Sequence, residues 1–592
     1  MVILTGPSGG TLATEGGPVG TVAPAIGAIR RPHWTVALTA PRSLAAALPN
    51  LHPVAVQVLF TRGHTSPELI RAFLNEDTLH DPGSLLGMDR AIGRIGRAVS
   101  QGETIATHGD FDVDGVTSTA VLTEGLRAAG SKVIPFIPLR TTTGYGVHRT
   151  AVETLAAAGV TLIVTGDTGT RAVEAVARAA ELGIDVIVTD HHLPGDVLPA
   201  AHALVNPHQA QCPYPFKDLS GCGVAWKLIA ALGREGLLSG CAPADLLDLV
   251  ALGTIVDVSP LVGENRWLVR RGLKRLAESQ RPGIRALLAN ATRDGGTRLD
   301  ERTVAFTIGP RLNAAGRMGN AATALELLMT RDNARAGELV TALEELNVER
   351  QQLTDRVMIA ARDQAARLAG DPILVLRGQD WPGGVLGLVA SRIAEEYRRP
   401  AVIVEEGLEV CRGSARSPSG LDLVALLGTC AGLMIEFGGH AQAAGFSVRT
   451  DNLDALAERL VAGCAGQPDL SQEPVVADYL LAEEELTWSL HQGLNALRPF
   501  GQSNAQPLFL SERLRVVEAR PVGVGGKHLR LRLRVGRQTL TGFGPNLGNR
   551  AASLSAAGST DALYALESST WNGVDSLELR LQDVRPSAVS VN

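Results

Sequence analysis

The chain has 592 residues, 45% of them hydrophobic, and a formal net charge of −6 at pH 7. At roughly 100–200 residues per domain, this length predicts about three to five domains with sizeable cores. The sequence excludes a helical membrane protein, because no apolar run reaches the ~20 residues of a membrane span, and its slight acidity means that any nucleic-acid-binding surface must be local.

The N-terminal segment, residues 1–40, is rich in Gly, Ala, Thr and Pro, and we expect a flexible tail there. It lacks the basic start and compact apolar core of a signal peptide. The six cysteines show no CxxC pairing, which indicates free thiols in a reducing compartment, so we expect the protein in the cytoplasm. In the helical region that follows, Ser66 and Pro67 are a predicted N-cap and first helical residue.

The stretch of residues 103–205 alternates between strand-like and helical patterns. Strands are predicted at 103–107, 132–137, 161–165, 185–189 and 203–205. Helices are predicted at 117–129, 151–158 and 171–182, each followed by a glycine, which is the usual helix stop. Strands that alternate with helices of this length indicate an α/β fold with a parallel, helix-covered sheet.

The rest of the chain divides by its pattern into three further regions. Residues 319–370 lie in a proline-free span with leucines at roughly helical spacing, and they predict a long helix that connects two lobes. A second α/β pattern follows over residues 371–466. Short β-like runs then dominate residues 467–592 and predict a small antiparallel barrel or sandwich. The first α/β domain would occupy residues 41–318.

The β-rich region carries the local positive charge that the chain as a whole lacks. Residues 511–550 contain nine Lys or Arg residues against two Asp or Glu. Arg530, Arg532 and Arg534 alternate with apolar residues, so that one face of the strand is basic. Single-strand binders pair such a face with aromatic stacking, and Phe543 is the best-placed aromatic, although the pattern favours a core position for it. We expect binding here to be mainly electrostatic and salt-dependent.

The stretch of residues 107–115, with the sequence THGDFDVDG, holds three aspartates at alternate positions, Asp110, Asp112 and Asp114. On a strand, alternate side chains share a face, so the three carboxylates would crowd together. Their repulsion favours a bound divalent cation, for which carboxylate oxygens are preferred ligands. The alternative is a polar loop that caps the following helix.

Three further segments place acidic residues or histidines at the ends of predicted elements. Asp167 follows one predicted strand, Asp190, His191 and His192 follow the next, and Asp257 follows an apolar helix. Ligands of open α/β sheets bind at the carboxyl ends of the strands, so these side chains are expected in one pocket. Histidine favours Mn²⁺ or another transition ion over Mg²⁺. A lone aspartate here is more often a helix cap, but four segments in this order are hard to explain as caps.

Together these motifs resemble the successive motifs of the DHH phosphoesterase superfamily, and within it the chain most resembles the RecJ family of bacterial single-strand-specific 5′-to-3′ DNA exonucleases. The likeness covers nearly everything after the N-terminal tail. It includes GPRLNAAGR at 309–317, GSARS at 413–417, GGHAQAAG at 438–445 and RPFGQSN at 498–504. The resemblance implies a DHH catalytic domain, a DHH-associated domain beyond the long helix and a C-terminal OB-like barrel.

The resemblance implies a two-metal phosphodiesterase, usually Mn²⁺-dependent, with Mg²⁺ as an alternative. One ion would be held by His108, Asp112 and Asp167, and the other by Asp114, Asp167, His191 and Asp257. Asp110 would join the first site or orient a ligand. Asp110, Asp190 and His192 are the implied catalytic residues, and the alternative for His192 is a hydrogen bond that only fixes its loop.

The resemblance also implies residues that bind nucleic acid or phosphate. Arginine forks and accessible backbone N–H groups suit phosphate oxygens. The implied set is Arg311, Asn313, Arg317, Arg412, Ser414, Arg416, Gly439 and His440, and the basic strand adds Lys527, Arg530 and Arg532. A surface ion pair is the alternative for each arginine.

The resulting hypothesis is a monomeric exonuclease for single-stranded DNA in recombination and repair, which releases 5′-mononucleotides alongside a single-stranded DNA-binding protein and a repair helicase. Two alternatives stay open. Other enzymes of the superfamily hydrolyse short RNA, cyclic dinucleotides or pyrophosphate, but they lack the OB-like tail or carry membrane spans. A binding scaffold without activity is disfavoured, because such relatives lose the acidic ligands that this chain retains.

Overall fold

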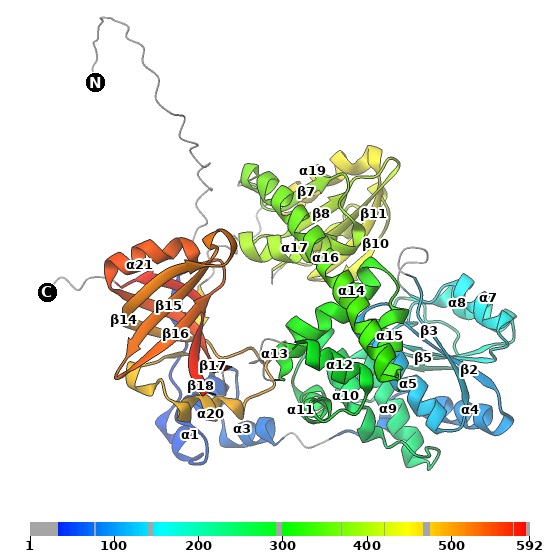
Figure 1. Cartoon of the computed structure of the whole chain (residues 1–592). Helices are drawn as coiled ribbons and strands as arrows, with labels where there is room; N and C mark the ends of the chain where they lie inside the picture. The colour runs from blue at the N-terminus through cyan, green and yellow to red at the C-terminus, as the bar shows by residue number, and fades with distance from the viewer. Residues whose placement is uncertain are drawn as a thin grey trace, which may run out of the picture. The chain divides into compact units, whose positions relative to one another are not determined.

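A computed structural model of the chain describes residues 33–75, 79–139, 146–291, 299–368, 370–418, 421–465, 474–571 and 574–587. Residues 1–32, which make up most of the predicted flexible tail, lie outside the described residues. The chain forms two compact units (Figure 1). The larger unit combines His33–Arg356 with Pro474–Asn592, and the smaller unit contains Val357–Glu473.

A five-stranded parallel sheet forms the centre of the first α/β domain, in the order β3-β2-β4-β5-β6. Its strands are β2 (Thr104–Gly109), β3 (Lys132–Phe136), β4 (Leu162–Gly166), β5 (Asp185–Thr189) and β6 (Ala203–Val205). The helices around them are α4 (Met88–Gln101), α5 (Val113–Ala128), α7 (Arg149–Ala157), α8 (Val173–Glu181) and α9 (Gly221–Arg234). The predicted parallel, helix-covered sheet is confirmed.

Helices cover both faces of this sheet, because alternate residues of its buried strands point to opposite sides. Ile105 and Val164 join a core with α4, α5 and α9, whereas Ala106 and Ile163 join a second core with α7 and α8. From β2 the chain moves to β3 on one side and later to β4 on the other. Such a switch point opens a crevice at the carboxyl ends of the strands, here those of β2 and β4.

A helical layer follows the sheet in the sequence and packs into the same core as α5 and α9. It consists of η2 (Pro243–Leu246), α10 (Leu247–Val256), α11 (Gly263–Ala277), α12 (Pro282–Ala291), α13 (Glu301–Thr303), the π-helical turn η3 (Val304–Ile308), α14 (Gly309–Met318) and α15 (Ala322–Met329). The long helix predicted over residues 319–370 is shorter in the structure, because α15 occupies the start of that range. It is α16 (Asn333–Arg367), which runs from the larger unit into the smaller one. Among the helices in the described ranges, none has both the length and the apolar character that crossing a membrane requires.

The smaller unit contains the second predicted α/β pattern. Its mixed sheet has the order β10-β11-β9-β8-β7, in which only β7 and β8 run parallel to each other within the described strands. The strands are β7 (Leu374–Gly378), β8 (Ala401–Glu405), β9 (Val410–Arg416), β10 (Met434–His440) and β11 (Ala443–Arg449). The helices are α17 (Gly383–Tyr397), α18 (Leu423–Gly428) and α19 (Leu453–Gly463).

The C-terminal region of the larger unit forms a barrel (Figure 1, orange to red). Its sheet has the order β13-β14-β15-β16-β18-β17, and an additional pairing of β14 with β17 closes it. The strands are β13 (Tyr479–Leu480), β14 (Phe509–Val522), β15 (His528–Val535), β16 (Gln538–Gly544), β17 (Ser559–Trp571) and β18 (Val574–Pro586), with the helices α20 (Trp488–Asn495) and α21 (Ala551–Ala557). The predicted OB-like barrel is confirmed.

The N-terminal helices share their core with the barrel, whereas the sequence led us to group them with the parallel sheet. They are α1 (Arg42–Ala46), α2 (Pro53–Thr61) and α3 (Pro67–Leu74), and Ser66 caps α3 as predicted. Leu59 of α2 is buried in the same core as Leu531 of β15. The short strand β1 (Trp34–Val36) pairs with β12 (Val475–Ala477), so part of the predicted tail is a strand.

Candidate metal centre

The aspartate-rich stretch, residues 107–115, overlaps the last three residues of β2 and runs into the first turn of α5. Asp110, Asp112 and Asp114 therefore do not alternate along a strand, which corrects the predicted geometry. Asp112 is the N-cap of α5, and its Oδ1 accepts a 3.0 Å hydrogen bond from the N–H of Gly115. The capping alternative holds for Asp112, while Asp110 and Asp114 are buried.

Asp114 is held by the N-terminus of α9. Its Oδ2 accepts a hydrogen bond of 2.7 Å from the N–H of Gly221, and its Oδ1 accepts one of 3.0 Å from the N–H of Cys222. Helix N-termini favour a negative charge of this kind. Gly253 of α10 also packs against the carboxylate, because a Cβ there would lie 2.7 Å from Asp114 Oδ1. The glycine lets α10 bring Asp257, at its C-terminal end, close to Asp114.

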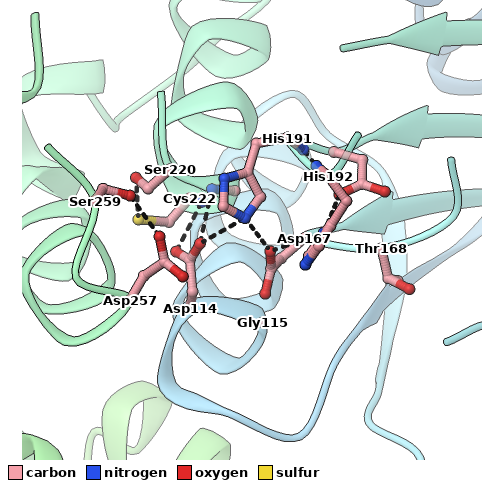
Figure 2. Close-up of polar contacts among 12 residues, drawn as sticks. Asp114, Gly115, Asp167, Thr168, His191, His192, Ser220, Cys222, Asp257 and Ser259 are labelled. Atoms are coloured by element: carbon pink, nitrogen blue, oxygen red, sulfur yellow. Dashed lines mark hydrogen bonds and ion pairs between the residues drawn. The ribbon is translucent and has the colours of Figure 1, made fainter. Parts of the chain in front are cut away.

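Asp167 follows β4 with a left-handed backbone, at a φ of 61°. A non-glycine residue in this region is strained, and such residues cluster at functional sites. Asp167 Oδ1 lies 3.1 Å from His191 Nε2, and the same nitrogen lies 3.9 Å from Asp114 Oδ2. Figure 2 shows the ring of His191 between the two carboxylates.

Two overlapping groups of side chains have their ligand atoms within 4.8 Å of one another. One group is Asp167, His191 and His192, and the other is Asp114, His191 and Asp257. Ser259 Oγ donates a hydrogen bond to Asp257 Oδ2 and so fixes this carboxylate (Figure 2). The structure thus brings together side chains from four segments that are far apart in the sequence. We call these five residues the ligand cluster.

Asp190 uses its oxygens to hold the backbone and the neighbouring histidine. Its Oδ2 accepts a 2.9 Å hydrogen bond from the N–H of Thr170, and its Oδ1 accepts hydrogen bonds from the N–H groups of His191 and His192. The same Oδ1 lies 2.8 Å from His192 Nδ1. Burial acts to raise the pKa of Asp190, but the hydrogen bond and charge of His192 outweigh it and lower the pKa. Asp190 therefore positions both histidines, and the catalytic role expected from the sequence stays a prediction.

His108 lies near the end of β2 and is fully buried. Within the described part of the chain, neither of its ring nitrogens has a hydrogen-bond partner. Burial lowers the pKa of His108 to about 4, so the imidazole is neutral at physiological pH. A buried polar ring without hydrogen bonds costs free energy unless a ligand satisfies it. His108 therefore fits a metal ligand, and its assignment to the first ion stays a prediction.

The carboxylates of the ligand cluster repel one another. Burial, and then the charge of Asp257, raises the pKa of Asp114 to about 6. Burial, followed by the charges of Asp114 and Asp112, raises the pKa of Asp167 well above its usual value. Burial acts to lower the pKa of His191, but Asp257 and Asp114 outweigh it and the pKa is raised. A divalent cation would remove this repulsion, and mixed oxygen and imidazole donors suit such an ion.

Three family models match this chain in succession. "DHH family, N-terminal domain" matches residues 104–254, "DHHA1 domain" matches residues 370–464 and "RecJ OB domain" matches residues 477–583. The single-stranded-DNA-specific exonuclease RecJ of Escherichia coli (strain K12) is 36% identical over 528 residues, which cover 85% of this chain and 91% of that protein. The chain belongs to the RecJ family.

Other RecJ proteins give the same result. RecJ of Bacillus subtilis (strain 168) is 35% identical over 547 residues, which cover 91% of this chain and 68% of that protein. The crystal structure of RecJ from Thermus thermophilus in complex with Mn²⁺ has a TM-score of 0.80 and 33% identity, over 94% of this chain and 80% of that one. The Mg²⁺ complex gives a TM-score of 0.72 and 31% identity, over 94% and 79%. These RecJ structures hold the kind of ion that the ligand cluster fits.

The RecJ-type stretch at 309–317 supports the ligand cluster from α14. Asn313 Oδ1 accepts a 3.1 Å hydrogen bond from the N–H of Val113, so Asn313 holds the aspartate-rich loop. The phosphate contact expected for Asn313 stays a prediction. Arg311 Nε lies 2.6 Å from Glu344 Oε2, which is the ion-pair alternative. Arg317 is half-buried in the last turn of α14.

Two further RecJ-type motifs, around residues 412–417 and at 438–445, lie mainly on three neighbouring strands of the smaller unit. They supply Arg412, Ser414 and Arg416 on β9, and Gly439 and His440 on β10. Strand β11 lies between them and pairs with both. Arg416 Nη1 donates a 3.0 Å hydrogen bond to Ser414 Oγ. The structure thus gathers these residues on one sheet of the smaller unit.

The basic strand of the RecJ OB domain is β15. Arg530, Arg532 and Arg534 are exposed and alternate with buried residues, as predicted, and Lys527 just before the strand is also exposed. Phe543 on β16 pairs with Arg530 and is 42% exposed. The expected core position of Phe543 is therefore wrong, because its side chain lies on the same outward face as the arginines.

Sequence reasoning missed several residues that support the RecJ-type centre. Ser259 and Gly221 contact the cluster as described above, and Asn206 Nδ2 donates hydrogen bonds to Thr170 Oγ1 at 2.9 Å and to the carbonyl of His192 at 2.8 Å. A signal for Asn206 existed, because it directly follows a predicted strand, as Asp190 does.

Proposed function

We propose that this chain is a metal-dependent exonuclease that degrades single-stranded DNA and acts in recombination and repair. The observation that carries the proposal is the ligand cluster near the carboxyl ends of the sheet strands. It stands in a chain whose RecJ relatives are named single-stranded-DNA-specific exonucleases. The exposed basic strand β15 adds the surface that a single strand requires.

The ligand cluster, together with His108 and Asp112, would hold two ions, with Mn²⁺ as the first choice and Mg²⁺ as the alternative. One ion is assigned to His108, Asp112 and Asp167, and the other to Asp114, Asp167, His191 and Asp257. When bound, such ions supply the Lewis acidity that activates water and stabilises charge on the phosphoryl group. Asp110, buried two residues before the α5 cap, would join the first site or orient a ligand of its ion.

Hydrogen bonds within the protein hold the histidine and the carboxylates of the site in fixed orientations. Asp190 accepts from His192 Nδ1 and so fixes the orientation of the ring. The other ring nitrogen, Nε2, is then the atom that would contact the scissile phosphate. The helix N-terminus of α9 and Ser259 keep the Asp114 and Asp257 carboxylates in place without the metal.

Substrate binding would involve the phosphate-binding motifs of both units. In the smaller unit, Arg412, Ser414, Arg416, Gly439 and His440 would bind the 5′-terminal nucleotide, which sets 5′-to-3′ polarity and the release of 5′-mononucleotides. In the larger unit, Lys527, Arg530 and Arg532 would hold the strand electrostatically, with Arg311 and Arg317 nearer the metal centre. The protein would act as a cytoplasmic monomer, alongside a single-stranded DNA-binding protein and a repair helicase.

A panel of labelled substrates tests this proposal. The full chain with Mn²⁺ is given a long 3′-labelled single strand, the same strand in a blunt duplex, and a short RNA. We expect stepwise shortening of the single strand from its 5′ end, little action on the duplex, and 5′-mononucleotides as products. Consumption of di- to pentanucleotides alone would contradict the proposal and favour a nano-RNase activity.

A further inference from the structure

The loop that carries Asp257 begins as a helix C-cap in a strained conformation. Asp257 is the C-cap of α10, and Val258 follows it with a left-handed backbone at a φ of 64°. The N–H of Val258 donates a 3.2 Å hydrogen bond to the carbonyl of Ile255. The N–H of Ser259 donates one of 3.3 Å to the carbonyl of Thr254. These two bonds define a Schellman motif, in which glycine usually takes the left-handed position, so a β-branched valine there is strained.

Burial of the Val258 side chain does not explain this conformation, because the residue is 61% exposed. Strained residues persist only where the surrounding contacts over-determine the backbone. Such contacts hold the loop here. The buried Ser259 donates a hydrogen bond from Oγ to Asp257 Oδ2, across the valine (Figure 2). Further along the loop, Asn265 Nδ2 of α11 donates a 3.1 Å hydrogen bond to the carbonyl of Pro260.

A turn far along the chain, residues 501–504, holds the end of this loop. Gly501 and Asn504 exchange two backbone hydrogen bonds, of 2.9 and 3.1 Å, which close the turn. At its tip, the carbonyl of Gln502 accepts a 2.8 Å hydrogen bond from the N–H of Leu261. A Cβ at Gly501 would lie 2.7 Å from Leu261 Cδ1, so the turn packs directly against the leucine. Because Leu261 is itself buried, a bulkier residue in the turn would displace the loop.

The turn is anchored to other elements of the larger unit. The side chain of Asn504 is buried, and its Nδ2 donates a 2.7 Å hydrogen bond to the carbonyl of Pro499. Its Oδ1 accepts a 2.5 Å hydrogen bond from Nη1 of Arg62, at the end of α2. The N–H of Phe500 donates a 2.9 Å hydrogen bond to Oε1 of Glu301, on α13. The turn is therefore fixed from several sides and is suited to hold the loop in place.

We propose that this turn, part of the RecJ-type stretch RPFGQSN, is a positioning element for the candidate metal ligand Asp257. Through Leu261 it keeps the loop in its strained conformation, and so keeps the Asp257 carboxylate beside Asp114 and His191. Without the turn, the loop would relax to an unstrained backbone and withdraw the carboxylate. The inference rests on the proposed function, because it concerns the ion that these three side chains would share.

The first test measures Mn²⁺ binding by the full chain without DNA, by calorimetry and by the EPR signal of unbound Mn²⁺. Gly501→Ala places a methyl group against Leu261, so it should weaken one Mn²⁺ site about ten-fold and leave the other close to its wild-type affinity. Arg62→Ala, which loosens the turn without adding an atom, should weaken the same site by a smaller factor. Gly93→Ala on α4 is the matched control, because an added Cβ there meets open space. Wild-type affinities in Gly501→Ala and Arg62→Ala would overturn the proposal.

A cycle with Asp257→Ala separates positioning from a general loss of stability. If the turn acts through Asp257, Gly501→Ala should weaken Mn²⁺ binding no further once the carboxylate has been removed. The same additional loss in the Asp257→Ala background would show that the turn acts on another part of the protein, and would overturn the proposal. Thermal unfolding in EDTA is measured for each variant, so that a change in fold stability is seen separately from a change in metal affinity.

Val258→Gly tests the strained loop directly. Glycine adopts the left-handed backbone without strain, so the loop should keep its conformation even when the turn no longer holds it. We therefore expect Val258→Gly to restore most of the Mn²⁺ affinity lost in Gly501→Ala, and the absence of any rescue would refute strain as the link between the turn and Asp257. Mn²⁺ binding and hydrolysis of a single strand by the wild type are measured in parallel. Their absence would refute the proposed function, whereas normal binding and hydrolysis without an effect of Gly501→Ala would refute only the positioning role.

Discussion

The parallel sheet and the barrel of the larger unit are assembled from the sequence in opposite ways. The sheet uses strands that follow one another within residues 104–205, with the helices between them packed on its two faces. The core of the barrel instead joins Leu59 and Ile70, near the N-terminus, to Phe509 and Leu579, more than four hundred positions later. The sheet carries the ligand cluster, and the barrel carries the basic strand.

Because their cores come from different parts of the sequence, the parallel sheet and the barrel should respond to different mutations. Changes in the ligand cluster should affect chemistry and the metal-dependent stability of the sheet. Changes in the N-terminal helices should affect the barrel, because these helices supply part of its core. The four predictions below each act on one region and leave the other as an internal reference.

Asp167→Ala should have the largest effect and should be confined to the sheet region. It removes a carboxylate shared by both proposed metal ions, so the rate of hydrolysis should fall on the order of 10³-fold or more. The measurement is single-turnover hydrolysis of a 5′-labelled single strand with Mn²⁺. Asp196→Ala is the matched control, because Asp196 is exposed on the same domain. Substantial Mn²⁺-dependent activity in Asp167→Ala would show that the bridging assignment is wrong.

Ile70→Ala tests the shared core of the N-terminal helices and the barrel. Ile70 is fully buried in that core, so its truncation should lower the free energy of unfolding of the barrel by about 2–5 kcal/mol. Its neighbour Leu69 is 47% exposed, and Leu69→Ala should change stability by less than about 0.5 kcal/mol. Hydrogen exchange should show lost protection in the barrel strands and retained protection in β2 and β4. Equal loss in both regions would mean that they unfold as one unit.

The pH dependence of the folding stability of the metal-free protein should come from the domain of the parallel sheet. The pKa of Asp114 is raised from 3.8 to about 6 in the folded state, so this state binds the proton more tightly than the unfolded state. The resulting stability is fully present below about pH 4 and is lost as the pH rises through about 6. Protons compete with the metal for the same carboxylate, so Mn²⁺ should raise Tm more at pH 7.5 than at pH 5. Thermal unfolding with Mn²⁺ or EDTA at both values checks this, and an equal rise would contradict it.

Arg532→Ala should have the smallest effect and should be confined to the barrel. Arg532 is exposed on the basic strand, so its removal should weaken DNA binding evenly across sequences. The slope of log K against log salt concentration should decrease by about one. The measurement is anisotropy over a salt series, with Arg178→Ala on α8 as a control that should leave the slope unchanged. An unaltered slope in Arg532→Ala would place the phosphate contacts elsewhere.

The parallel sheet, whose strands follow one another in the sequence, was predictable. The barrel, whose core includes distant N-terminal helices, was predictable only in part. Strands β5 and β6 were predicted at their observed limits, since each is a short apolar run followed by a polar end. The β-runs of the barrel were also recognised. The packing of α2 and α3 against the barrel was missed, because the apolar face of a helix does not specify the element that it packs against. The outward position of Phe543 was missed for the same reason.

The candidate site was predictable in its residue types and less so in its geometry. Asp167, His191 and Asp257 stand at the ends of predicted elements, and the structure brings them together. The role of Asp190 was not visible, because the backbone N–H groups that it binds depend on a turn that no residue type specifies. Asp112 was placed on a strand face with a helix cap as the alternative, and the structure confirms the cap, because the helix α5 begins one residue after it.

The left-handed backbone of Asp167 has a consequence for any mutational library made at this position. A residue at position 167 must adopt a positive φ and must also supply a carboxylate. Glycine and asparagine accept a φ of 61° readily, whereas valine and isoleucine do not. Substitutions should therefore fall into two classes: proteins that fold normally but do not cut, and proteins that also accumulate poorly in cells. Members of the first class would retain an intact nucleic-acid-binding surface and would serve as reagents that capture the substrate.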